Sequence, residues 1–237
     1  MSGTVKPGTL FGVGVGPGDP ELMTLKATRV IRSCTVVAYP ANNDGYSQAR
    51  FIAAECLQTQ IELPIRLAFT VDRRTTLQAY DAAAETISAF LRDGMDVAVL
   101  CEGDPLLFGS FIYLMERLTA HTIEIVPGIS SVMAAASATQ IPLARLNQKL
   151  CIVPATATLE SIESALHGND PLVILKPGKR RGMILQMLEN CGRLADAAYV
   201  ENASRPEQRV VNCLETLDRN APGPYFALLI VRGRQNE

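Results

Sequence analysis

The sequence contains very few of the residues that build metal sites and catalytic triads. In 237 residues it has two histidines, His121 and His167, and no tryptophan. Its six cysteines are well separated, and no two of them lie closer than 22 residues. Structural zinc and iron–sulfur sites use Cys-x-x-Cys-type pairs, so this spacing excludes them, and two histidines argue against a His-based triad. We predict that the protein has no metal site and that its thiols are reduced and mostly buried.

Charge of one sign and long apolar runs are also missing. Lys plus Arg number 22 and Asp plus Glu number 24, which gives a formal net charge of -2. This balance removes the electrostatic argument for binding nucleic acid or an anionic membrane, although a local basic pocket is compatible with it. No stretch of about 18 apolar residues occurs, and residues 1–8 lack the basic and apolar regions of a signal peptide. We therefore expect a soluble, cytoplasmic protein without a membrane or nucleic-acid partner.

The first half of the chain alternates apolar strands with helices. With 48% hydrophobic residues, the chain has enough apolar material for one large domain or two small ones. Short apolar runs predict strands over residues 9–15, 34–39, 96–101 and 122–126. Helical spacing and capping residues predict a helix after Thr24 and helices over 47–57, 75–92, 109–119 and 130–138. Strands that are nearly all apolar and alternate with helices indicate a parallel sheet covered on both faces.

The pattern changes at residues 140–147, which we interpret as an interdomain linker. Beyond this linker, fewer helices separate the expected strands, which lie near residues 150–154, 172–175, 197–201, 209–212 and 225–231. Strands in close succession are typical of antiparallel pairing, so the second half predicts a mixed sheet. We predict an α/β protein of two domains, residues 1–143 with a mainly parallel sheet and residues 144–237 with a mixed sheet.

Three turns follow strands of the first half and are built from glycine, proline and small polar residues. They are residues 12–20 (Gly-Val-Gly-Val-Gly-Pro-Gly-Asp-Pro), 102–109 (Glu-Gly-Asp-Pro-Leu-Leu-Phe-Gly) and 126–131 (Val-Pro-Gly-Ile-Ser-Ser). In an open α/β sheet, ligands usually lie beyond the carboxyl ends of the strands. Glycine lets the backbone approach a ligand and proline fixes the loop, although any one of these turns could also be a tight turn without a ligand.

Two common nucleotide-binding motifs do not account for these glycines. In a dinucleotide-binding turn the helix begins directly on the glycines, whereas Pro17, Asp19 and Pro20 intervene here. The expected second strand also ends in Tyr39 and Pro40 where an acidic residue should bind the ribose. A phosphate-binding P-loop is excluded because Gly178-Lys179 lacks both the upstream glycine and the following Ser or Thr.

Taken together, the three turns resemble the signature of the tetrapyrrole methylases, the S-adenosylmethionine-dependent enzymes of the cobalamin and sirohaem pathways. The pattern G-x-G-P-G-D-P, G-D-P-x-x-F-G and P-G-x-S-S is matched in order and spacing, and the resemblance covers nearly the whole chain. The branch that methylates precorrin-2 at C20 is the most similar one, on residues 22–27, 36–40, 101–111 and 153–156. The sequence departs from the family at Gln140, which often is glycine, and at Ala68-Phe69 in a variable stretch.

The resemblance implies two α/β domains that bind S-adenosylmethionine in the cleft between them, a homodimer, and S-adenosylhomocysteine as a product. Carried over by position, cofactor contacts fall on a set of turn and strand-end residues. These are Pro17, Glu102, Gly103, Asp104, Ser130, Ser131, Pro177, Ala198 and Ala227. Asp104 has a purely structural alternative, because its side chain can cap its own turn through an Asx hydrogen bond.

The implied reaction is the methylation of precorrin-2 at C20, which gives precorrin-3A and needs mainly the positioning of two reactants. The catalytic residues are unknown; Glu102 and Asp104 are candidates for the proton acceptor. The substrate carries eight carboxylates, which favours Lys176 and Lys179 in the basic run 176–181 as contacts, although Lys179 could equally face water on a surface helix. Tyr39, at a strand end, could line the macrocycle or be packed inside the domain.

Three other functions use the same turns. One is another tetrapyrrole methylase, acting on a cobalt-containing substrate or at a different ring carbon. A second is a ribosomal-RNA methyltransferase of the same fold, although 5% aromatic residues and a balanced charge argue against RNA binding. The third is a non-enzymatic protein that binds a nucleoside-like ligand.

Overall fold

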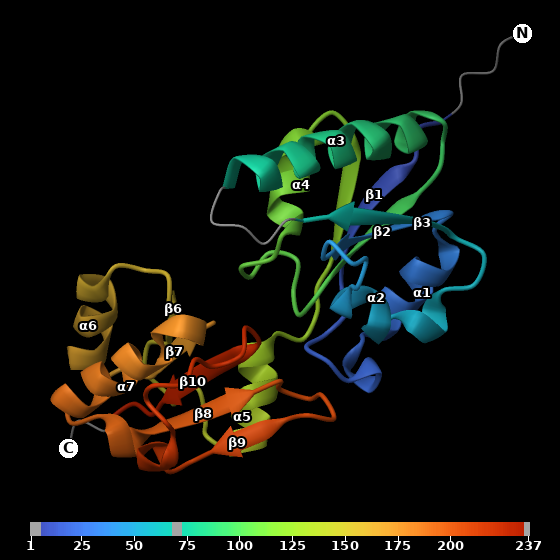
Figure 1. The fold of residues 1–237 in the computed structure, drawn as a ribbon. Helices are drawn as coiled ribbons and strands as arrows, with labels where there is room; N and C mark the ends of the chain where they lie inside the picture. The colour runs from blue at the N-terminus through green and yellow to red at the C-terminus, as the bar shows by residue number, and fades with distance from the viewer. Residues whose placement is uncertain (1–5, 68–72, 235–237) are drawn as a thin grey trace, which may run out of the picture. The chain divides into compact units, whose positions relative to one another are not determined.

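The computed structural model describes residues 6–67 and 73–234, and the chain divides into two compact units, Met1–Ser130 and Ser131–Glu237 (Figure 1). Ala68 and Phe69 lie outside the described residues. The second unit begins before the linker predicted at 140–147, because helix α5 (Ser131–Thr139) belongs to it by packing. Val132 and Ala135 of this helix are buried against apolar residues of the second sheet.

The first unit contains a five-stranded parallel sheet in the order β3-β2-β4-β1-β5. The strands are β1 (Thr9–Gly14), β2 (Val36–Ala41), β3 (Ile61–Arg66), β4 (Val97–Cys101) and β5 (Thr122–Val126). Strand β1 lies between β4 and β5, so the carboxyl ends of these three strands are neighbours. The predicted parallel sheet is confirmed.

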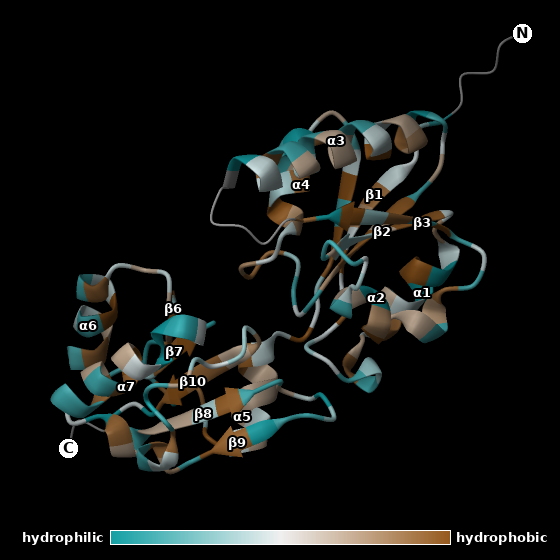
Figure 2. Ribbon diagram, viewed as in Figure 1, coloured by the Kyte–Doolittle hydropathy of each residue, from teal (hydrophilic) through white to brown (hydrophobic). Residues whose placement is uncertain are grey.

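Helices cover both faces of this sheet (Figure 1). They are α1 (Leu25–Ser33), α2 (Gln48–Ile52), α3 (Arg73–Arg92) and α4 (Phe111–Arg117). Because successive strand residues point to opposite faces, β1 buries Val13 against α1 and α2, and Leu10 against α3 and α4. Figure 2 shows the result as strands that are mostly hydrophobic beneath helices with mixed surfaces.

The second unit contains a five-stranded mixed sheet in the order β6-β7-β10-β8-β9, as predicted. The strands are β6 (Cys151–Pro154), β7 (Leu172–Leu175), β8 (Ala197–Glu201), β9 (Arg209–Val211) and β10 (Ala227–Val231). Strand β10 runs antiparallel to both β7 and β8, while β6 and β7 are parallel. Helices α6 (Leu159–His167) and α7 (Arg181–Asn190) share one apolar core with this sheet.

Strand β3 is absent from the prediction. It is an edge strand with mostly exposed residues, and Pro64, a residue type that strands disfavour, stands within its short alternation of apolar residues. An edge strand tolerates proline because one side of its backbone needs no partner. Pro64 lies opposite Tyr39 of β2, and no strand of the described residues pairs with β3 on its other side.

The six cysteines are free in the described part of the chain, but only Cys34, Cys56 and Cys101 are buried, and Cys213 is exposed. Burial raises the pKa of Cys34 and of Cys101 to about 12, so these thiols stay protonated near neutral pH. Among the described residues, no helix combines the length and the apolar content needed to cross a bilayer.

Candidate functional site

The three glycine-containing turns lie at the same edge of the first sheet. They follow β1, β4 and β5, whose registers pair Gly14 with Cys101 and Val13 with Val126. Parallel strands end at a common edge, so each turn begins beside the next. The three turns, which are separate in the sequence, are therefore neighbours at the position where α/β proteins bind ligands.

The first two turns are joined by backbone hydrogen bonds. The amide of Gly103 donates to the carbonyl of Gly16 at 2.8 Å, and the amide of Gly16 donates back at 3.4 Å. Gly14 sits where all three turns meet: a Cβ on this residue would lie 2.6 Å from the carbonyl oxygen of Gly103 and 2.6 Å from the Cα of Gly128. Only glycine permits so close an approach of three backbone segments.

The Asp104 carboxylate holds the second turn to the third. Its Oδ1 accepts a hydrogen bond from the amide of Leu106 at 2.9 Å, which is the Asx hydrogen bond considered above. Its Oδ2 accepts a second one from the amide of Gly128 at 3.1 Å. Asp104 thus has a structural task in this edge, whether or not it also contacts a ligand.

The other predicted contacts of the first unit lie on the same three turns. Pro17 is buried in the first turn, Glu102 is exposed at the start of the second, and Ser130 is half-buried at the end of the third. Ser131 is the first residue of α5. The structure therefore brings together the turns that carry Pro17, Glu102, Gly103, Asp104 and Ser130.

The sequence analysis did not single out an exposed apolar group in the second turn. Leu106, Leu107 and Phe108 are 46%, 38% and 45% exposed, and Phe108 has a positive φ of 54°. Large apolar side chains held in solvent beside a ligand-binding edge are suited to contact an apolar part of a ligand. The sequence signal that could have found them is three consecutive apolar residues, Leu106 to Phe108, within a turn, where neither helical spacing nor strand alternation explains them.

Tyr39 is packed inside the first unit. It is 5% exposed, and its hydroxyl donates to Oε2 of Glu62 at 2.6 Å. Arg50 donates to the same carboxylate, from Nη2 to Oε1 at 2.8 Å. The Arg50 hydrogen bond holds the pKa of Glu62 below its usual value, and burial raises the pKa of Tyr39. These contacts tie the edge strand β3 to β2 and α2.

This network predicts a pH-dependent loss of stability. A carboxylate whose pKa is lowered by folding stabilises the fold fully above its unfolded-state pKa, and this contribution disappears as the pH falls through the folded-state pKa. We expect Glu62→Gln to lower the melting temperature at pH 7, and the difference from wild type to shrink between about pH 5 and pH 3. Thermal melts monitored by circular dichroism measure the melting temperature of both proteins at each pH. A difference in melting temperature that stays constant from about pH 5 to pH 3 would show that the ionised Glu62 carboxylate does not stabilise the fold.

In the second unit, Lys176, Pro177 and Ala227 lie at one end of the sheet. The amide of Lys176 donates to the carbonyl of Ala227 at 2.9 Å, and Lys176 has a positive φ of 57°. Its Nζ lies 5.3 Å from the centre of the Tyr225 ring. Pro177, directly after it, is buried. A lysine and two strand ends thus meet at the carboxyl end of β7.

The structure does not bring Ala198 to this end. Ala198 pairs with Ile230 near the start of β8, and it is buried in the apolar core with a 1% exposed fraction. The carboxyl end of β8 is instead followed by Asn202, whose amide donates to the carbonyl of Phe226 at 2.8 Å. Asn202 and Ser204 both have positive φ, a backbone feature often found at functional sites.

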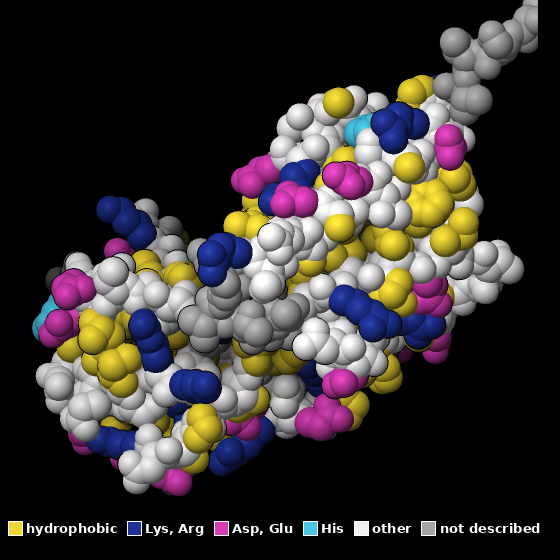
Figure 3. All heavy atoms as spheres, turned by 45° about the horizontal axis from the view of Figure 1, so that its top comes forward, with side chains coloured by type: hydrophobic (Ala, Val, Ile, Leu, Met, Phe, Trp, Pro, Cys, Tyr) yellow, Lys and Arg dark blue, Asp and Glu magenta, His cyan; other side chains and the backbone are white. Residues whose placement is uncertain are grey.

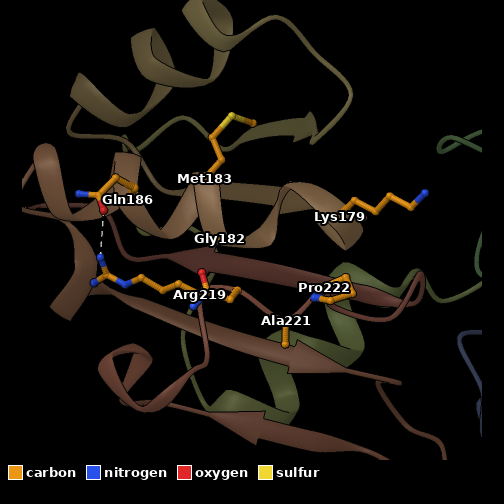
Figure 4. A pocket seen from close by; sticks show the side chains of 8 residues that line it. Lys179, Gly182, Met183, Gln186, Arg219, Ala221 and Pro222 are labelled. Atoms are coloured by element: carbon orange, nitrogen blue, oxygen red, sulfur yellow. Dashed lines mark hydrogen bonds between the residues drawn. The ribbon is translucent and has the colours of Figure 1, made fainter.

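Lys179 is exposed and lines a surface hollow of about 540 Å³ beside α7 (Figure 4). The hollow is also lined by Gly182, Met183, Gln186 and the segment 219–222. In Figure 4 the amine of Lys179 points away from Gln186, which accepts a hydrogen bond from Arg219 at 3.1 Å. Among the described residues, no three His, Cys, Asp or Glu side chains are grouped so as to hold a metal ion.

Comparisons with known proteins give one consistent family. A family model described as Tetrapyrrole (Corrin/Porphyrin) Methylases matches residues 9–218. Cobalamin biosynthesis protein CobIJ of Mycobacterium bovis is 38% identical over an alignment of 237 positions, which covers 95% of this chain and 46% of that protein. The chain thus spans about half the length of this relative. Precorrin-2 C(20)-methyltransferase of a Sinorhizobium species is 34% identical over an alignment of 243 positions, which covers 98% of each chain.

A solved structure has a similar fold. It is uroporphyrin-III C-methyl transferase from Thermus thermophilus, complexed with S-adenosyl homocysteine. The likeness covers 95% of this chain and 97% of the other, with a TM-score of 0.67 and 25% sequence identity.

Proposed function

Because the chain belongs to the tetrapyrrole (corrin/porphyrin) methylases, we propose that it transfers a methyl group from S-adenosylmethionine to C20 of precorrin-2 in cobalamin biosynthesis. The products are precorrin-3A and S-adenosylhomocysteine. The observation that carries this proposal is the similarity, over nearly all of both chains, to a relative named for that reaction. The subfamily stretches of the sequence support the same choice.

S-Adenosylmethionine supplies an activated methyl group with a good leaving group, so the residues of this chain mainly have to hold the reactants in line. The edge formed by the turns around Gly14, Gly103 and Gly128 suits such a ligand, because close backbone packing fixes the three turns relative to one another. Substrate C20 forms the new bond to the methyl carbon as the carbon–sulfur bond breaks, and a proton leaves C20. Glu102 and Asp104 remain the candidates to accept that proton.

We assign the cofactor to residues of both units. In the first unit these are the three turns, with Pro17, Glu102, Gly103, Asp104, Ser130 and the adjoining Ser131. In the second unit they are Pro177 and Ala227, and the Asn202–Ser204 end of β8 replaces Ala198 because Ala198 lies near the other end of that strand. Both sets are proposed as cofactor contacts, and the protein is proposed to be a cytoplasmic homodimer.

Incubation with S-adenosylmethionine and precorrin-2 tests the activity. We expect a mass gain of one methyl group on the tetrapyrrole, and C20 as its position by nuclear magnetic resonance. Cobalt-precorrin-2, run in parallel, decides between the metal-free and the cobalt-containing substrate. A gain only with a later intermediate would assign the chain to another ring carbon, and no gain with any tetrapyrrole would overturn the proposal.

The substrate carboxylates are assigned to Lys176 and Lys179. We expect Lys179→Ala to raise the KM for the tetrapyrrole about tenfold while the KM for S-adenosylmethionine stays unchanged, because one charge-assisted contact is lost. Steady-state kinetics with each substrate varied in turn measures both constants. Lys149→Ala, which removes an amine from the loop before β6, is the control. An unchanged KM for the tetrapyrrole would remove Lys179 from the site.

The face of the molecule drawn in Figure 3 gives no support to an RNA substrate. On the face drawn in Figure 3, Lys and Arg side chains of the described residues are interspersed with Asp and Glu and form no continuous basic stripe. RNA-binding surfaces concentrate positive charge and stacking aromatics. A small polyanionic substrate needs only a few cations at one place.

A further inference from the structure

Among the described residues, the second unit buries two arginines, at opposite ends of its sheet. Arg193, which is 1% exposed, donates to the carbonyls of Leu166, Gly168 and Arg232. Arg232 directly follows the last residue of β10, so Arg193 contacts the end of the sheet where that strand finishes. Arg181, the first residue of α7, is 4% exposed and serves the end where β10 begins.

The Arg181 guanidinium holds a segment that has no helix or strand of its own. Its Nη2 donates to the carbonyl of Asp218 at 2.9 Å and to that of Ala221 at 2.7 Å. Its Nη1 lies 3.4 Å from Oε1 of Glu201, the residue of β8 that pairs with Ala227. Arg181 therefore connects residues 218–226 to the sheet end at which β10 starts.

Glycines let the same segment approach α7 closely. The amide of Gly223 donates to the carbonyl of Gly178 at 3.0 Å. A Cβ on Gly182 would overlap the carbonyl oxygen of Arg219, and a Cβ on Gly223 would overlap the Tyr199 hydroxyl. Figure 4 shows Gly182 on α7 beside the segment that carries Arg219. Residues 218–226 are thus fixed between Arg181, the start of α7 and Tyr199.

This end of the sheet leaves two polar atoms unsatisfied. Arg181 Nε and the Tyr199 hydroxyl are buried without a hydrogen-bond partner among the described residues, and the guanidinium lies 5.5 Å from the centre of the tyrosine ring. The Nε of Arg193, by contrast, donates a hydrogen bond to Oδ2 of Asp196 at 2.9 Å. Arg181 therefore makes its hydrogen bonds to the segment and to Glu201 through Nη1 and Nη2 alone.

We propose that Arg181 is a positioning residue for the cofactor site: by fixing residues 218–226, it sets the placement of Lys176, Tyr225 and Ala227 at the carboxyl end of β7. These three residues are directly linked, since the Lys176 amide binds the Ala227 carbonyl and the Lys176 amine lies over the Tyr225 ring. The inference rests on the proposed function, which places cofactor contacts at this sheet end.

The test compares Arg181→Lys with Arg193→Lys. Both variants keep a positive charge but lose the guanidinium fork that binds several carbonyls. We expect both to lower the melting temperature, and only Arg181→Lys to raise the Kd for S-adenosylhomocysteine, by about tenfold in isothermal titration calorimetry. The KM for S-adenosylmethionine should rise in parallel, and the Kd of Arg193→Lys should stay within about twofold of wild type.

A second pair of variants leaves Arg181 untouched. Gly223→Ala pushes a methyl group against the Tyr199 hydroxyl and so displaces the segment. We expect a raised Kd for S-adenosylhomocysteine, and we expect the added substitution Tyr199→Phe to restore it by removing the hydroxyl. If Gly223→Ala raises the Kd only by destabilising the unit, and not by displacing the segment, adding Tyr199→Phe will not restore the Kd.

The outcomes separate the two proposals. If wild type binds S-adenosylhomocysteine while both Arg181→Lys and Gly223→Ala bind it equally well, the positioning role is overturned and the proposed function stands. If Arg181→Lys and Arg193→Lys weaken binding to the same extent, the effect is general to the unit and the positioning role is also overturned. If wild type binds no S-adenosylhomocysteine, the proposed function fails and this inference fails with it.

Discussion

Gly14→Ala is expected to abolish binding of S-adenosylhomocysteine and to lower the free energy of unfolding by about 3 kcal/mol. The new Cβ would lie 2.6 Å from the Gly103 carbonyl oxygen and from the Gly128 Cα. Both are backbone atoms, which cannot rotate away as a side chain could, so the three turns must separate. Isothermal titration calorimetry measures the first effect and urea denaturation the second.

Gly168→Ala is the matched control for this substitution. Gly168 follows α6 in the second unit, with a φ of -69°, and the nearest atom to its Cβ would be the Ala165 carbonyl oxygen at 3.4 Å. We expect a change in the free energy of unfolding of at most about 0.5 kcal/mol, and an unchanged Kd. Normal binding by Gly14→Ala would show that the close contact of the turns does not shape the cofactor site.

Asp104→Ala is expected to raise the Kd for S-adenosylhomocysteine about a hundredfold, because two backbone amides lose a charged acceptor at once. These are the amides of Leu106, within the second turn, and of Gly128, in the third. In Asp104→Asn the amide oxygen can replace only one carboxylate oxygen, since the amide nitrogen does not accept. We therefore expect a smaller rise, about tenfold. Calorimetric titration of both variants gives the two values.

Asp170→Ala provides the comparison for a carboxylate remote from the turns. Asp170 accepts one hydrogen bond, from the Lys149 amide at 3.0 Å, in the second unit. Its removal should leave the Kd within about twofold of wild type. If Asp104→Ala raises the Kd no more than Asp170→Ala does, the Asp104 carboxylate does not hold the turns in their binding geometry.

The parts of the fold that depend on local pattern could be predicted from the sequence. The apolar runs of β1, β4 and β5 and the capping residue Thr24 of α1 lie where expected, and the two sheet types are confirmed. The family is confirmed as well, because the order and spacing of three short turns are linear properties of the chain. Helix α6 was missed although Thr158 caps it and Ile162 and Leu166 are buried at helical spacing.

The failures concern distances between residues that are remote in sequence. Ala198 was carried over by position from the family resemblance as a strand-end residue, whereas its pairing with Ile230 places it near the start of β8. The contacts of Tyr39 and of Arg181 could not be predicted for the same reason. Tyr39 meets Glu62 across two strands, and Arg181 reaches carbonyls nearly 40 residues further along the chain.

The place of β1 in the middle of the first sheet has a consequence for how this unit folds. Its pairings join Leu10 to Val97 and Thr9 to Thr122, so the first strand to be synthesised can pair only after the fourth and fifth strands have been made. Such non-local pairing makes folding slow and leaves strand edges open during synthesis. The contact among Gly14, Gly103 and Gly128 forms only when β5 docks, so the edge that carries the three turns is completed in the same step that closes the sheet.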